Sequence, residues 1–144
     1  MKILFTTDGS PCSDMALREG CRLLSARGAE ALVVAVLEPV VYAAGYEGMG
    51  AGLTAIIDQE ATRLGADLDK ARATLAELGV QATVRELEGD PAAQILAAAA
   101  EFQPDVIVMG SHGRGAIGRL MLGSVSDQVL HHWAGSVLII RPSA

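Results

Sequence analysis

Glycines and a serine with a regular spacing follow a short apolar segment late in the chain. Gly110 and Gly113 come directly after residues 105–109, and Gly123-Ser124 follow with nine residues between. A strand that leads through glycines to a helix N-terminus is a natural anion site, because the first backbone N–H groups of a helix lack intrahelical partners and the dipole favours negative charge. The spacing therefore predicts a phosphate-binding loop.

The side chains of this loop add to the same chemistry. We expect the hydroxyls of Ser124 and Ser126 to donate to an anion, and Arg114 and Arg119 to be the only local cations that offset its charge. The glycines at positions 110, 113 and 123 would let the backbone approach a ligand and adopt positive φ. A simpler alternative remains open: Ser124-x-x-Asp127 is a capping-box pattern, which by itself explains both residues.

Two better-known phosphate loops do not fit the same segment. A Walker A loop needs a lysine after its last glycine, and no lysine follows Lys70. Residues 113–118 spell G-x-G-x-x-G, but a dinucleotide fingerprint should follow the first strand of the fold, with an acidic residue about twenty positions further on. Here it follows the fourth strand, and His132-Trp133-Ala134 stand at that distance.

Few other residues are candidates for chemistry. His112 is a possible acid or base, although a solvated loop histidine is the simpler interpretation. Cys12 and Cys21 fall on one predicted helix, roughly 13 Å apart along its axis, and we expect both to face the sheet as small apolar residues. The scattered histidines and cysteines form no dense metal-ligand motif, so we assign no metal ligands and no catalytic residues. Mg²⁺ held mainly by phosphate oxygens, with Asp8 nearby, is the metal site we expect.

Composition limits the partners of the chain. Its 144 residues suffice for one domain, 1–144. The formal net charge of −6 disfavours binding to nucleic acid or anionic lipid. No apolar run has the length of a membrane helix, and the first residues do not resemble a signal peptide. We therefore expect a cytoplasmic protein with no nucleic-acid or membrane partner.

Alternating strands and helices must position the loop. We expect strands at residues 2–7, 31–37, 80–87, 105–109 and 136–140. We expect helices from Ser10-Pro11 to Gly28, over 53–78, after Asp90-Pro91 and over 124–132. This pattern predicts a single-domain, flavodoxin-like or Rossmann-like α/β fold, with an open parallel sheet of order 3-2-1-4-5 and four helices on two faces. Ligands bind such a sheet where the winding reverses, here between the first and fourth strands. The glycine-rich residues 39–52 are a flap over this site or an idle linker.

The loop spacing carries a family resemblance. G-2x-G-9x-G-[ST] is the nucleotide-binding signature of the universal stress protein family, and the chain resembles that family over nearly its whole length, including Thr7-Asp8-Gly9-Ser10 and the GSHGRG turn at 110–115. Members with this signature typically bind ATP or other adenine nucleotides and form homodimers. The resemblance implies that Asp8 contacts the ribose, that the Val36 backbone meets the adenine, and that the residues at 123–126 hold the phosphates. The implied site residues are Thr7, Asp8, Val36, Met109, Gly110, Gly113, Arg114, Gly123, Ser124, Val125 and Ser126.

The last strand suggests how two subunits would meet. It is apolar on both faces although the expected order places it at an edge, and pairing with a second copy would cover Val137, Leu138, Ile139 and Ile140. One departure from the family stands at Ala134-Gly135-Ser136, where many members have a Pro-Cys-Pro-like entry to this strand. We therefore expect a dimeric, ATP-binding switch or sensor of the stress response, with AMP or ADP as alternative ligands. A slow ATPase or phosphotransferase, and an interaction module that binds no nucleotide, remain the alternatives.

Overall fold

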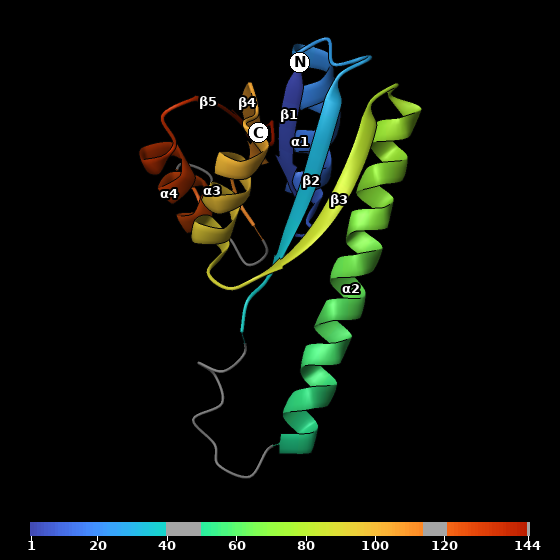
Figure 1. Cartoon of the computed structure of the whole chain (residues 1–144), viewed down its shortest axis with the longest axis vertical. Coiled ribbons are helices and arrows are strands. Elements are labelled where there is room, and N and C mark those ends of the chain that lie inside the picture. Colours follow the sequence, from blue (N-terminus) through green and yellow to red (C-terminus); the bar gives the residue numbers. More distant parts are fainter. Residues whose placement is uncertain (40–49, 114–120, 144) are drawn as a thin grey trace.

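A parallel sheet with helices on both faces forms the protein (Figure 1). The computed structural model describes residues 1–39, 50–113 and 121–143. In these ranges the elements are β1 (Lys2–Thr6), α1 (Pro11–Leu23), β2 (Glu30–Leu37), α2 (Gly50–Glu77), β3 (Gln81–Glu88), α3 (Pro91–Phe102), β4 (Val106–Gly110), α4 (Ser124–His132) and β5 (Ser136–Ile140).

The strand order is β3-β2-β1-β4-β5, with every neighbouring pair parallel, and it confirms the predicted sheet. The central strand β1 pairs with β2 on one side and with β4 on the other, so that Leu4 lies opposite both Leu32 and Ile107. Strand β3 lies at one edge and alternates between exposed and half-buried residues, as its sequence predicts. The expected bounds of α4 and β5 are confirmed to the residue.

Alternate residues of each strand enter two separate cores. On one face Phe5 and Val33 pack with α1 and α2, and on the other Leu4 and Val34 pack with α3 and α4. Strand β2 is buried on both faces because helices cover both sides of it, which accounts for its continuous aliphatic run. The two cores hold β1 and β4 rigidly side by side, and the loops that leave their carboxyl ends start from fixed points.

Helix α1 begins as predicted and ends early. The Ser10 side chain accepts a hydrogen bond from the Ser13 N–H at 3.2 Å, and Pro11 occupies the first turn. We expected the helix to run to Gly28, which is wrong, because Leu24 is already its C-cap and Ser25 adopts φ 49°. The chain then turns back so that the Gly28 N–H donates to the Gly79 carbonyl at 2.9 Å, joining this turn to the end of α2.

The two cysteines of α1 differ in burial. Cys21 is buried between α1 and the sheet, as expected, and burial raises the pKa of its thiol above the ordinary value. The stability gained from keeping this thiol neutral is present below about pH 9 and is lost as the pH rises through the raised pKa. Cys12 is only half-buried, and its Sγ lies 3.8 Å from the Ile140 carbonyl oxygen.

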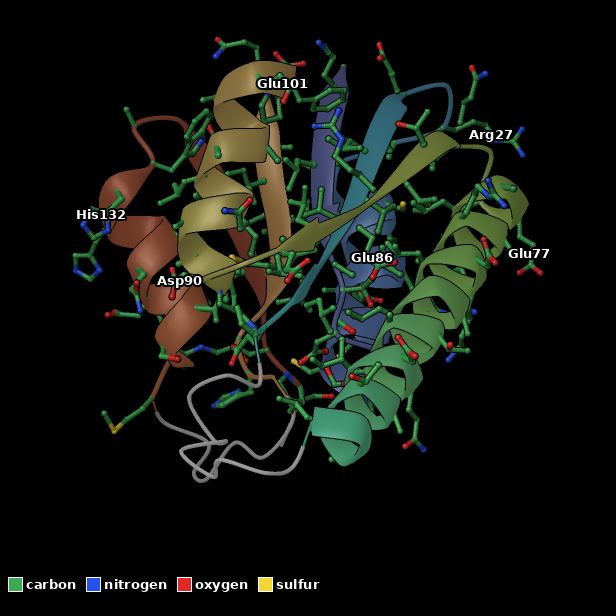
Figure 2. The ribbon with its side chains drawn as sticks, turned by 60° about the horizontal axis from the view of Figure 1, so that its bottom comes forward. Arg27, Glu77, Glu86, Asp90, Glu101 and His132 are labelled. Atoms are coloured by element: carbon green, nitrogen blue, oxygen red, sulfur yellow. The ribbon has the colours of Figure 1, made fainter. Side chains whose placement is uncertain are left out.

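Charged side chains lie on the outside of the helices and along β3. Figure 2 shows Glu77 and Glu101 on the outside of their helices and His132 pointing away from α4, and Glu86 of β3 is also exposed. Within residues 1–39, 50–113 and 121–143, no helix combines the length and the apolar composition that crossing a bilayer requires. The long helix α2 covers one face of the sheet, and its N-terminal end extends past the carboxyl ends of the strands (Figure 1).

Candidate functional site

The carboxyl ends of β1, β2 and β4 and the start of α4 enclose a pocket of about 600 Å³. This volume lies in the range of small-molecule sites, roughly 300–1,000 Å³. The pocket lies where the winding of the sheet reverses, between β1 and β4, as expected for an open parallel sheet. Ten of the predicted site residues line it: Thr7, Asp8, Val36, Met109, Gly110, Gly113, Gly123, Ser124, Val125 and Ser126.

Some of the predicted features lie outside the described residues. These are Arg114 and Arg119 of the glycine-rich loop, most of the G-x-G-x-x-G segment 113–118, and residues 40–49 of the expected flap.

The start of α4 opens into this pocket without a side-chain cap. Gly123 is the N-cap, with φ −62° and ψ 157°, and the first helical residue is Ser124. The alternative of a capping box is therefore wrong, because Ser124 stands one position inside the helix and the N-cap, Gly123, has no side-chain cap. Asp127 instead lies beside His131, at 3.4 Å between carboxylate oxygen and Nδ1. Within the described residues, no side chain caps the backbone N–H groups of the first turn, whose hydrogen bonds an anion could therefore accept.

The Ser126 hydroxyl, which we expected to donate to an anion, donates to main-chain carbonyls in this structure. Ser126 is buried, and its Oγ lies 3.1 Å from both the Ser111 and the Gly123 carbonyl oxygens. Ser111 is also buried, its carbonyl accepts the Gly123 N–H at 2.7 Å, and its own N–H donates to the Ile140 carbonyl. These bonds fix the start of α4 against the ends of β4 and β5. Ser124 is exposed at the pocket wall, so of the two predicted hydroxyl donors it is the one placed for a ligand.

The turn after β1 presents the Asp8 carboxylate. The Ser10 N–H donates to Asp8 Oδ1 at 2.9 Å, and Thr7 Oγ1 accepts the Gly9 N–H at 3.1 Å. Gly9 adopts φ 75°, which glycine tolerates and which lets the chain turn tightly into α1. Asp8 is half-buried at the pocket wall, so one carboxylate oxygen is held by the turn while the side chain faces the pocket.

The glycines of the signature are needed for close packing and not for positive φ. Our expectation of positive φ at positions 110, 113 and 123 is wrong, since none of them has it. A Cβ on Gly110 would lie 2.9 Å from Cys12 Sγ and 3.2 Å from the Cys12 carbonyl carbon. A Cβ on Gly113 would lie 2.7 Å from Asp8 Oδ2, and one on Gly123 would lie 3.1 Å from the Ser111 carbonyl oxygen. Because it has no Cβ, each of these glycines lets a neighbouring residue pack directly against its backbone: Cys12, Asp8 and Ser111, respectively.

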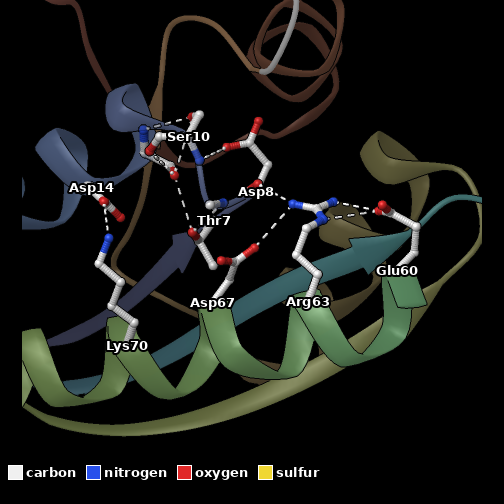
Figure 3. A network of polar contacts seen from close by, with 10 residues as sticks. Thr7, Asp8, Ser10, Asp14, Glu60, Arg63, Asp67 and Lys70 are labelled. Carbon is white, nitrogen blue, oxygen red and sulfur yellow. Dashed lines mark hydrogen bonds and ion pairs between the residues drawn. The ribbon is translucent and has the colours of Figure 1, made fainter. Parts of the chain in front are cut away.

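A cation that sequence reasoning missed lines the pocket from α2. Arg63 Nη2 lies 2.6 Å from Glu60 Oε2, and Arg63 Nη1 lies 3.3 Å from both Asp67 Oδ2 and the Asp8 carbonyl oxygen (Figure 3). The hydrogen bond to Glu60 raises the pKa of Arg63, so the guanidinium stays charged. The spacing of Glu60, Arg63 and Asp67 on a helix predicts only exposed ion pairs. Nothing local in the sequence connects them with Asp8.

His112 is less solvated than its loop position suggests. The side chain is half-buried, its Nδ1 lies 2.7 Å from Ser111 Oγ, and its buried Nε2 has no hydrogen-bond partner in the described part of the chain. Our interpretation as a solvated loop histidine is therefore wrong. Among the described residues, no three His, Cys, Asp or Glu side chains gather as metal ligands.

The chain is similar to known proteins over its whole described length. The profile of the universal stress protein family matches residues 1–141. Universal stress protein YxiE of Bacillus subtilis is 35% identical over 145 residues, which cover 97% of this chain and 98% of that protein. Universal stress protein UspA from Lactobacillus plantarum superposes with a TM-score of 0.83 at 21% identity, covering 98% of this chain and 97% of the other.

Two further solved structures with this fold contain adenine nucleotides. A universal stress protein in complex with cAMP has a TM-score of 0.71 at 23% identity, covering 99% of this chain and 98% of the other. A universal stress protein family protein from Arabidopsis thaliana with AMP bound has a TM-score of 0.68 at 18% identity, covering 100% of this chain and 93% of the other. At these identities the likeness shows a shared fold.

Proposed function

The chain belongs to the universal stress protein family, and from this premise we propose that it binds an adenine nucleotide in the pocket at the ends of β1, β2 and β4. ATP is the ligand we propose first, with AMP and ADP as alternatives. The protein then acts as a nucleotide-dependent switch or sensor in a stress response.

One observation supports this proposal most: site residues that the family resemblance implies, from both halves of the chain, line the same pocket. Thr7, Asp8 and Val36 come from the first half, and the glycines and serine of the signature come from the second. The cAMP and AMP complexes of structures with the same fold support an adenine nucleotide as the ligand class.

The pocket fits the parts of such a ligand. The N–H groups at the start of α4 and the Ser124 hydroxyl receive the phosphates, the Val36 backbone receives the adenine, and the Asp8 carboxylate receives the ribose hydroxyls. His112 also lines the pocket, and a small rotation of its ring would let the buried Nε2, which lacks a partner in the described ranges, meet a phosphate oxygen. Mg²⁺ would be held by the phosphates themselves, with Asp8 as the nearest proposed carboxylate.

Thermal unfolding with and without Mg-ATP tests the proposal. A ligand that binds only the folded state stabilises it by about 2.7 kcal/mol at a hundred times its Kd, so the unfolding midpoint is expected to rise with ATP concentration. Mass spectrometry of the natively purified, then denatured protein is expected to detect an adenine nucleotide. GTP serves as the control for the base, and phosphate release measured on the same samples tests the ATPase alternative. An unchanged midpoint together with no released nucleotide would contradict nucleotide binding.

We also propose that β5 pairs with the β5 strand of a second copy. β5 lies at the edge of the sheet opposite β3, and Val137, Leu138 and Ile139 are only half-buried there. Val137→Lys is expected to convert a dimer to a monomer in analytical ultracentrifugation, because a charge at the edge opposes strand pairing. Thr83→Lys on the other edge strand adds the same charge and is expected to leave the mass unchanged. If both variants sediment like the parent protein, this interface is wrong.

A further inference from the structure

Three polar side chains in one row on α2 contact the turn after β1 and the start of α1 (Figure 3). Arg63 donates to the Asp8 carbonyl oxygen at 3.3 Å, and the Asp67 carboxylate packs against Gly9 so closely that a Cβ there would collide with it. Lys70 Nζ then lies 2.7 Å from Asp14 Oδ2 in the first turn of α1. Of these three side chains, only Arg63 lines the pocket.

The Arg63 guanidinium is itself held in place. Its Nε and Nη2 both donate to Glu60 Oε2, at 3.2 and 2.6 Å, while Nη1 reaches Asp67 Oδ2 at 3.3 Å. Only 31% of the Arg63 side chain is exposed. Its guanidinium is bound by Glu60 on one side and by Asp67 on the other, and it faces the loop after β1. An arginine fixed by two carboxylates holds the third group that it contacts, the Asp8 main chain, in a defined position.

The Asp8 carboxylate depends on that main chain for its orientation. The Ser10 N–H fixes Oδ1, and Gly113 leaves only enough room for Oδ2 because it has no Cβ. The side chain is therefore held by the Ser10 N–H and packed against Gly113, and a shift of the Asp8 backbone would carry the carboxylate with it. The bond from Arg63 to the Asp8 carbonyl opposes that shift.

We propose that Arg63 is a positioning residue of the site, which holds the Asp8 main chain so that the Asp8 carboxylate meets the ribose hydroxyls. Arg63 thereby sets the preference for ribonucleotides over deoxyribonucleotides. This inference rests on the proposed nucleotide site and adds a residue that the family signature does not contain.

The test compares the binding of ATP with that of 2′-deoxyATP and 3′-deoxyATP by calorimetry. In the parent protein, ATP is expected to bind at least about tenfold more tightly than the analogue that lacks the hydroxyl contacted by Asp8, since a hydrogen bond to a charged group has this magnitude or more. Arg63→Ala is expected to lose this advantage, with weaker ATP binding and almost unchanged binding of that analogue. In an Asp8→Asn background, Arg63→Ala is expected to have no further effect on the preference.

Control variants distinguish the proposed positioning of Asp8 by Arg63 from two other effects, a change in the charge of the pocket and a loosening of α2. Arg63→Ala combined with Glu60→Gln keeps the net charge of the pocket and is still expected to lose the preference. Arg72→Ala removes a charge from an exposed ion pair on the same helix, and Lys70→Ala removes the ion pair between α2 and Asp14 of α1; both variants are expected to keep the preference. Equal losses for ATP and both analogues in Arg63→Ala, or the same loss in Lys70→Ala, would overturn the inference. If the parent binds ATP and Arg63→Ala keeps the ribose preference, only this inference fails; if the parent binds no nucleotide, the proposed function fails with it.

Discussion

A protein carrying Gly123→Val and Ser124→Ala is expected to stay folded and to lose at least a hundredfold in affinity for ATP. The Gly123 backbone is extended, at φ −62°, so valine is not strained there. Its Cβ would lie 3.1 Å from the Ser111 carbonyl oxygen and 3.5 Å from His112 Cα, and its methyl groups would narrow the space between that turn and α4. Loss of the Ser124 hydroxyl removes a hydrogen bond to a charged group, of about 1.5–3 kcal/mol. Calorimetry with Mg-ATP measures the loss, and circular dichroism checks the fold.

A glycine elsewhere in the structure provides the matched control. Gly65 on α2 has open space where a Cβ would stand, and Gly65→Val is expected to bind ATP like the parent protein. Ser124→Ala alone adds no bulk and is expected to reduce the affinity by roughly tenfold or more. Undiminished ATP affinity in the folded double variant would contradict the assignment of the α4 start as the phosphate site.

Gly110→Val is expected to destabilise the protein even when no nucleotide is present. The side chain would meet Cys12 Sγ at 2.9 Å and the Cys12 carbonyl carbon and oxygen at 3.2 Å. The main-chain atoms cannot rotate away, so the N-terminal turn of α1 must move from the end of β4. Overpacking of this kind costs typically about 1–3 kcal/mol. Guanidinium unfolding without ligand measures the loss of unfolding free energy.

A smaller pair of variants tests this packing explanation. Gly110→Ala is expected to lose part of the same stability. Cys12→Ala in the Gly110→Ala background removes the sulfur contact but leaves the main-chain contacts, and is expected to recover only part of the loss. If Gly110→Val unfolds at the same denaturant concentration as the parent while its nucleotide binding is abolished, then this glycine provides access for the ligand and not room for α1.

The sheet order and the place of the pocket were predictable because they follow from patterns distributed along the whole chain. The aliphatic run of β2, the alternation in β3 and the Gly123-Ser124 helix start are each strong local signals, and the structure confirms the elements they predict. The end of α1 was not predictable. Its apolar periodicity continues to Leu24, whereas the helix stops where Ser25 takes positive φ, which no local pattern indicates.

The errors within the site have a common physical origin in contacts distant in sequence. Ser126 has the hydroxyl that a ligand-binding donor needs, but this hydroxyl donates to the carbonyl of Ser111, fifteen positions earlier. The spacing of Arg63 from Glu60 and Asp67 predicts only ion pairs on the helix surface, but the fold brings Arg63 to Asp8, 55 positions earlier. The spacing of residues in one helix predicts which side chains share a face, and only the packed fold determines what that face meets.

The central position of β1 has a consequence for how the chain reaches its folded state. β1 is made first, yet its β4 partner follows roughly 100 residues later, since Leu4 lies opposite Ile107. At a synthesis rate of about 5–20 residues per second, the apolar segment Ile3-Leu4-Phe5 waits on the order of 5–20 s on the ribosome before that partner exists. Loop closure over such a distance also makes refolding slow compared with that of a helical bundle of similar size. The strand that organises the nucleotide pocket is therefore the one most dependent on protection, by early pairing with β2 or by a chaperone, while the protein is being made.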